Sequence, residues 1–107
     1  MSEPIFDRIK REISENPILV YMKGTPELPQ CGFSAATIEI FEELGRPFNS
    51  VDVLTNPAKR DGIKRFSNWP TIPQVYIGGQ FVGGCDIVGE MYQNGELAEL
   101  VKKTLEG

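Results

Sequence analysis

Histidine is absent from this 107-residue sequence, and cysteine occurs only twice. Because histidine is the commonest general base and a frequent zinc and haem ligand, sites that depend on it are excluded. Two cysteines cannot supply four thiolates to a metal within one chain, and they do not form the dense disulfide framework of small secreted proteins. Any thiol chemistry therefore has to use one or both of these cysteines.

The sequence also lacks an excess of basic residues and a long apolar run. Its 15 acidic and 11 basic residues give a net charge of −4, so we expect no nucleic acid partner. No run approaches the roughly 18 apolar residues of a membrane helix, so we expect no membrane partner. The charged first 15 residues contain no apolar signal-peptide core. We expect a reducing cytoplasm of the bacterial type, or an organelle matrix after processing.

What is present is the composition of one folded domain over residues 1–107, with 40% hydrophobic and 24% charged residues. Periodicity and turn residues predict alternating helices and strands. The helices are expected at about 3–15, 34–44, 57–66 and from 86 to the end, with a break near Asn94-Gly95. The strands are expected at 18–22, 48–53, 75–77 and 80–82.

This order predicts an α/β fold with a mixed four-stranded sheet and helices on both faces. Ile18–Met22 is apolar without alternation, which is typical of a strand covered on both faces. The right-handed crossover rule makes the first two strands parallel. Gly78-Gly79 predicts a tight hairpin between the last two.

Cys31 is the first candidate for chemistry. It follows a loop stiffened by Pro26 and Pro29 and directly precedes a helix, where free amides and the helix dipole favour an anion. Lys23, at the other end of the loop, adds positive potential. This placement is typical of a nucleophilic or metal-binding thiolate; the alternative is a buried structural cysteine. Ser34 stands where a C-x-x-C motif has its second cysteine, so dithiol exchange within the motif is excluded.

Cys85 follows Gly83-Gly84 and precedes Asp86 at the start of a helix. As a resolving cysteine it would need its Cα within about 7 Å of that of Cys31, which the sequence does not decide. The alternative is a small buried side chain. The amides of Cys85 and Asp86 are also placed to hold a carboxylate.

A basic cluster, Lys59, Arg60, Lys64 and Arg65, lies on the helix that follows Pro57. Cations in the first turn of a helix oppose its dipole, and such violations often mark functional sites. A solvated charged face is the alternative. Further on, the Ile72-Pro73 bond precedes a strand, where a cis peptide would turn the Ile72 backbone toward an extended ligand.

Together these residues resemble the monothiol glutaredoxins of the CGFS type. The resemblance rests on Lys23–Thr25, Pro29 and Cys31–Ser34, followed by Trp69–Gln74 and Gly83–Ile87. It covers essentially the whole chain, and the chain resembles the single-domain form of the family. It implies a thioredoxin-like (glutaredoxin) fold, glutathione as a cofactor, and a [2Fe–2S] cluster held between two protomers.

The resemblance also implies roles for individual residues. Cys31 corresponds to the active thiol and iron ligand, while Lys23 and Arg60 hold the glycyl carboxylate of glutathione. The Ile72 backbone pairs with the cysteinyl part, and relatives often have valine or phenylalanine there. Cys85 and Asp86 receive the γ-glutamyl end. One Cys31 from each of two chains and two glutathione thiols would supply the four donors that such a cluster needs.

Three functions remain open at this point. The chain is expected to carry [2Fe–2S] clusters to apo iron–sulfur acceptor proteins, as a homodimer when the cluster is bound. The alternative is an oxidoreductase in which Cys31 removes glutathione from mixed disulfides. A third is a regulatory module in which a BolA-type protein replaces one protomer. Whether the chain is an enzyme is therefore left undecided by its sequence.

Overall fold

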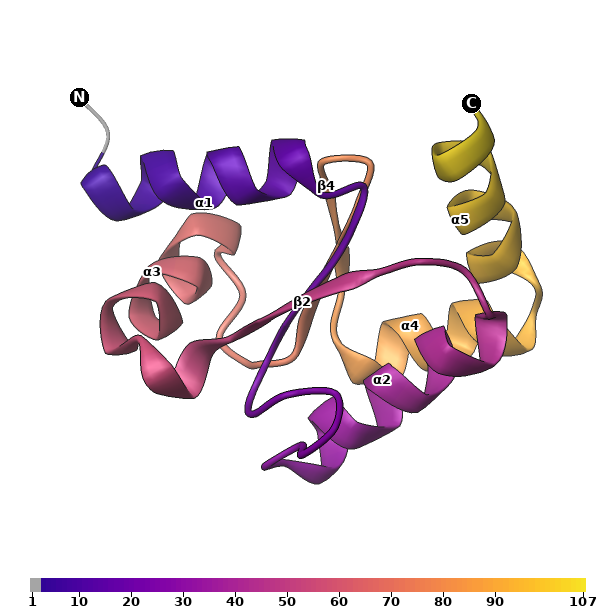
Figure 1. The fold of residues 1–107 in the computed structure, drawn as a ribbon, viewed down its shortest axis with the longest axis horizontal. Coiled ribbons are helices and arrows are strands. Elements are labelled where there is room, and N and C mark those ends of the chain that lie inside the picture. The colour runs from indigo at the N-terminus through magenta and orange to yellow at the C-terminus, as the bar shows by residue number, and fades with distance from the viewer. Residues whose placement is uncertain (1–2) are drawn as a thin grey trace.

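The computed structural model describes residues 3–107 and contains one four-stranded sheet with helices on both faces (Figure 1). The predicted order of helices and strands is confirmed, with one short 3₁₀ helix added. The elements are α1 (Pro4–Glu15), β1 (Ile18–Met22), α2 (Gly32–Leu44), β2 (Asn49–Asp52), η1 (Val53–Thr55), α3 (Pro57–Ser67), β3 (Gln74–Ile77), β4 (Gln80–Gly83), α4 (Cys85–Gln93) and α5 (Glu96–Glu106).

The strands lie in the order β2-β1-β3-β4. β1 pairs in parallel with β2, whereas β3 is antiparallel to both β1 and β4. The predicted mixed sheet with two parallel leading strands is thus confirmed. All five residues of β1 are buried, as expected for a strand covered on both faces. Within residues 3–107, no helix has the length and apolar character needed to cross a bilayer.

Alternate side chains of the central strands point into two separate cores. Ile18, Val20 and Met22 pack with α2, α4 and α5 on one face. Leu19 and Tyr21 pack with α1 and α3 on the other. The sheet is therefore held from both sides, and the ends of its central strands are rigid supports for the loops that leave them.

Several element boundaries differ from the predicted ones by one residue, the start of α2 differs by two, and two of the differences bear on the site. α2 begins at Gly32 instead of Ser34, because the backbone leaves the extended conformation directly after Cys31. The strand predicted to reach Val53 ends at Asp52, where the carboxylate accepts the Leu54 amide at 2.9 Å and closes the 3₁₀ turn η1. Cys31 is thus the N-cap residue of α2, one position before the helix.

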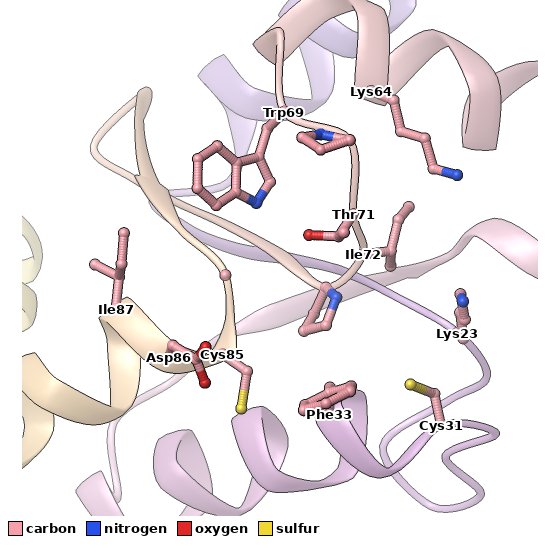
Figure 2. A pocket seen from close by; sticks show the side chains of 13 residues that line it. Lys23, Cys31, Phe33, Lys64, Trp69, Thr71, Ile72, Cys85, Asp86 and Ile87 are labelled. Carbon is pink, nitrogen blue, oxygen red and sulfur yellow. The ribbon is translucent and has the colours of Figure 1, made fainter.

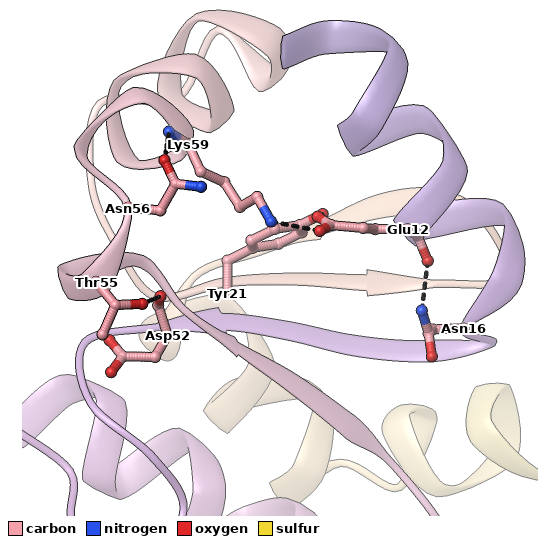
Figure 3. A network of polar contacts seen from close by, with 7 residues as sticks. All are labelled: Glu12, Asn16, Tyr21, Asp52, Thr55, Asn56 and Lys59. Carbon is pink, nitrogen blue, oxygen red and sulfur yellow. Dashed lines mark hydrogen bonds and ion pairs between the residues drawn. The ribbon is translucent and has the colours of Figure 1, made fainter.

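A polar network joins α1, β1 and α3 (Figure 3). The Lys59 ammonium forms an ion pair with Glu12, and the Tyr21 hydroxyl donates to the same carboxylate at 2.8 Å. Only 10% of the Lys59 side chain is exposed. Lys59 therefore belongs neither to a solvated face nor to a ligand site, and its charge in the first turn of α3 is balanced by α1.

Candidate functional site

A cavity of about 510 Å³ lies between the start of α2, the end of α3, the segment before β3 and the start of α4 (Figure 2). Its volume is within the range of small-molecule sites. The residues that line it are Lys23, Cys31, Phe33, Lys64, Trp69, Pro70, Thr71, Ile72, Pro73, Gly84, Cys85, Asp86 and Ile87. Five of the six site residues predicted from the sequence are among them: Lys23, Cys31, Ile72, Cys85 and Asp86.

Cys31 is placed so that its thiolate is favoured. The residue is extended and is itself the N-cap of α2, and the Phe33 and Ser34 amides of the first turn lie within reach of its sulfur. The pKa of Cys31 is lowered, chiefly by the backbone amide of Ser34 and further by that of Phe33, the Lys23 charge and the Ser34 hydroxyl. Burial opposes this shift. The sequence-based expectation of an activated thiol is supported by this geometry.

The loop before Cys31 is held in place by backbone and side-chain hydrogen bonds. The Lys23 amide donates to Ser34 Oγ at 3.1 Å, and the Gln30 amide donates to the Lys23 carbonyl at 2.9 Å. The Gly24 amide donates to Asp52 at 2.9 Å. A Cβ on Gly24 would lie 2.5 Å from a backbone oxygen, so no other residue fits the turn. Lys23 and Cys31 are thereby positioned by β1 and β2.

The Trp69–Pro73 segment forms the wall opposite Cys31 (Figure 2). The Ile72–Pro73 peptide is cis, the isomer considered from the sequence. Ile72 itself is buried and packs in the core shared by α1 and α3. Its pairing with a ligand backbone stays a prediction.

The beginning of α4 closes the third side of the cavity. Gly84 is its N-cap residue and offers no side chain to bond the first amides of the helix. A Cβ at Gly84 would lie 3.2 Å from the Pro73 carbonyl, which explains the glycine at this close approach. Cys85 is half-buried, and both it and Cys31 are free thiols. In the view of Figure 2, Phe33 lies between the two cysteines.

The residues of the basic cluster have different surroundings in the structure. Arg65 forms ion pairs with Glu3 and Asp61. Lys64 lines the cavity, whereas Arg60, the predicted ligand, is not among the lining residues. In the part of the chain that the structure describes, neither Arg60 nor Lys64 has an ion-pair partner. The sequence did not indicate that Lys64 is the cluster's cavity residue, although its i+4 spacing from Arg60 places both on one helix face.

Apolar side chains stand exposed around the opening. Phe33 is 64% exposed, Ile87 40% and Trp69 36%. All three line the cavity. The sequence alone does not single out Phe33 or Ile87 as site residues, because their exposure depends on tertiary packing.

The cavity side chains were compared with the donors that a metal ion needs. Over residues 3–107, no group of three cysteine, aspartate or glutamate side chains is arranged to hold a metal ion. The cavity offers one activated thiol at Cys31 and cationic side chains from Lys23 and Lys64. It is therefore suited to a thiol chemistry that involves an anionic partner molecule.

The model of the family named Glutaredoxin matches residues 18–82. The chain belongs to the glutaredoxin family. It is 53% identical to Glutaredoxin 4 of Haemophilus ducreyi over 92% of each chain, and 53% identical to Glutaredoxin 4 of Escherichia coli over 92% of this chain and 85% of that protein. A protein of Synechocystis described as an uncharacterized monothiol glutaredoxin is also 53% identical, over 92% of each chain. These relatives place this glutaredoxin among the monothiol members.

Solved structures confirm the predicted glutaredoxin (thioredoxin-like) fold. Reduced apo GrxS14 of poplar has a TM-score of 0.82 and 44% identity, covering 94% of this chain and 93% of that chain. A buckwheat glutaredoxin solved as a glutathione complex has a TM-score of 0.84 at 23% identity, covering 94% and 89%. At that identity the likeness concerns the fold alone.

Proposed function

We propose that this glutaredoxin binds glutathione in the cavity and that two glutathione-loaded protomers hold a [2Fe–2S] cluster for delivery to apo iron–sulfur proteins. The observation that carries the proposal is the single activated thiol, Cys31, at a cavity with two cationic side chains. Glutathione has a carboxylate at each end and a thiol between them. Lys23 and Lys64 suit one carboxylate, and the uncapped amides at the start of α4 suit the other.

Counting donors supports a pair of protomers. A [2Fe–2S] cluster is usually held by four thiolates. Cys31 from each of two chains and one glutathione thiol on each side supply that number. Because two donors belong to an exchangeable small molecule, the cluster is suited to release. We further propose a BolA-type protein as an alternative partner in place of one protomer, and a reducing cytoplasm as the site of action.

The experiment that tests this proposal is anaerobic reconstitution with iron and sulfide, followed by visible absorbance. The wild type should assemble cluster with glutathione and little cluster with a non-thiol reductant. Cys31→Ser should stay colourless, because a hydroxyl is a poor ligand for this centre. Cys85→Ser keeps the backbone amide and should still assemble cluster. Full assembly without any small thiol, or a colourless but folded Cys85→Ser, would contradict the proposal.

The cationic side of the site is tested by calorimetric titration with glutathione. Lys23→Ala and Lys64→Ala are each expected to weaken binding about tenfold, since a charge-assisted hydrogen bond contributes at least about 1.4 kcal/mol. Arg60→Ala is expected to weaken binding less, because Arg60 lies one helical turn before Lys64 on α3, outside the cavity lining, and contributes to binding mainly through its charge. Lys102→Ala, which removes a lysine of α5 outside this cavity, is the control and should bind normally. Unchanged affinity in the three site variants would reject the carboxylate assignment.

The lowered pKa of Cys31 also favours a second candidate function, the removal of glutathione from mixed disulfides. In that reaction the Cys31 thiolate attacks the glutathione sulfur, the protein thiol leaves, and a second glutathione thiol resolves the new disulfide to yield oxidised glutathione. The colour of the reconstituted protein separates the two candidate functions. A protein that remains colourless after reconstitution, yet turns over glutathione disulfides rapidly, would favour this second function.

A further inference from the structure

Gln74 does not line the cavity, but its side chain forms hydrogen bonds with the Trp69–Pro73 segment, which does. We propose that Gln74 is a positioning residue that holds the Trp69–Pro73 segment in the shape that receives glutathione. The proposal rests on the proposed function for the identity of the ligand. Gln74 is the last residue of the Trp69–Gln74 block that resembles the family, and the resemblance implies no role for it.

The contacts of Gln74 are those of an internal brace. Its side chain is fully buried, and its amide nitrogen donates to the carbonyl oxygens of Trp69 at 3.1 Å and Thr71 at 3.2 Å. Its amide oxygen accepts the Tyr76 hydroxyl at 3.2 Å. Both amide hydrogens are used, and both act on the same segment.

The wall needs such a brace beyond its first residue, where the Trp69 amide donates to the Lys64 carbonyl and to Ser67 Oγ, each at 3.1 Å. Pro70 and Pro73 have no amide hydrogen, and the segment lies before β3, outside the hydrogen-bonded ladder of the sheet. Among the described residues, no donor other than Gln74 reaches the carbonyls of Trp69 and Thr71. The Gln74 side chain therefore replaces the ladder that a strand would have had.

The brace is itself anchored in the centre of the sheet. The Gln74 backbone is paired with Tyr21 on β1, and Tyr76 packs edge-on against the Tyr21 ring at 5.7 Å. Burial raises the pKa of Tyr76 to about 12, so its hydroxyl remains a donor at neutral pH. The wall opposite Cys31 is in this way connected to the strand that ends beside Lys23.

Two variants remove the brace by different means. Gln74→Glu keeps the shape and replaces both donated hydrogens with acceptors that face two carbonyl oxygens. Gln74→Leu removes all polar atoms and leaves the carbonyls without a partner. Tyr76→Phe retains the amide and loses only the hydroxyl that orients it, so a smaller effect in the same direction is expected. Val101→Ala, in the core on the other face of the sheet, is the control for general destabilisation.

The test combines hydrogen exchange of the Trp69 amide, which bonds the Lys64 carbonyl at the start of the wall, measured without any thiol, and calorimetric titration with glutathione. We expect exchange about tenfold faster and binding about tenfold weaker in both Gln74 variants, a change that one or two neutral hydrogen bonds account for. Val101→Ala should lower the melting temperature and leave both measurements unchanged. Tyr76→Phe, which preserves the fold most closely, should show a reduced version of both effects.

Several results would overturn the assignment. Wall exchange that is unchanged in the folded variants rules out the brace, and faster exchange with unchanged affinity rules out a role in ligand positioning. If Val101→Ala lost as much affinity for glutathione as the Gln74 variants, the loss would be explained by general destabilisation of the fold. If the wild type does not bind glutathione, the proposed function is wrong. Hydrogen exchange measured without any thiol then still decides whether Gln74 holds the wall.

Discussion

Cys31 illustrates how a residue of ordinary chemistry is changed by its position. The sulfur lies at the N-cap position of α2, where the Ser34 and Phe33 amides have no helical carbonyl to bond. Those amides stabilise the thiolate, with the Lys23 charge as a weaker contribution. The backbone therefore does most of the activation, and replacement of neighbouring side chains should alter reactivity less than the motif suggests.

The pH dependence of alkylation tests this at Cys31. In a Cys85→Ser background, the midpoint for reaction with iodoacetamide should lie below that of an ordinary cysteine, whose pKa is about 8.5. Because a lowered pKa keeps the thiolate at lower pH, the reaction should slow only as the pH falls through that lower midpoint. Lys23→Gln should move the midpoint upward only part of the way, because the Ser34 amide remains. A midpoint at or above that of a cysteine peptide would refute the assignment.

At the scale of elements, α1 and α3 are joined by a pair of opposite charges and not by apolar contacts alone. Glu12 receives both the Lys59 ammonium and the Tyr21 hydroxyl. Burial and the carboxylate raise the pKa of Tyr21 above its usual value, which keeps this hydroxyl protonated. The network therefore holds α3 against α1 and β1, outside the cavity lining.

Lys59→Met is expected to destabilise the fold by about 3 kcal/mol, near the lower limit for breaking a buried ion pair, because Glu12 keeps some contact with water. Chemical denaturation measures the loss. The double variant Glu12→Gln, Lys59→Met should lose less than the sum of the single variants, since neither charge is left alone. Arg46→Met breaks an exposed pair with Glu106 and should cost no more than about 0.5 kcal/mol.

A double variant whose loss equals the sum of the single losses would contradict direct coupling between Glu12 and Lys59. The same variants separate stability from binding. Glutathione affinity should be preserved in all of them wherever the protein is folded, because none of Glu12, Lys59 and Arg46 lines the cavity.

On the scale of the whole molecule, the cavity is built from parts of the chain that only the sheet brings together. Cys31 follows β1, Lys64 lies on α3, and Cys85 opens α4. The exposed rings of Phe33 and Trp69 and the side chain of Ile87 border the opening. This border is apolar and is suited to contact with the second protomer of the proposed cluster-bound form.

Native mass measurement should find the cluster-bound protein with two chains, one [2Fe–2S] cluster and two glutathiones. Iron chelation should release both glutathiones and return the protein to its cluster-free mass, because in the proposed complex the cluster supplies the bonds between the two protomers. Ile87→Glu should reduce the two-chain form by placing charge at the border, whereas Leu54→Glu, outside the cavity lining, should not. A cluster carried by a single chain would contradict this prediction.

The sequence by itself determined the order of the elements, the parallel pairing of β1 and β2, and most residues around the cavity. It did so because these features depend on local periodicity, on a handedness rule and on motifs with fixed spacing. It did not reveal that Lys59 is neutralised by Glu12, that Lys64 and not Arg60 lines the cavity, or that Gln74 supports its wall. Those outcomes depend on which faces of α1, α3 and β3 pack together, and only the tertiary structure decides between cations that are one helical turn apart.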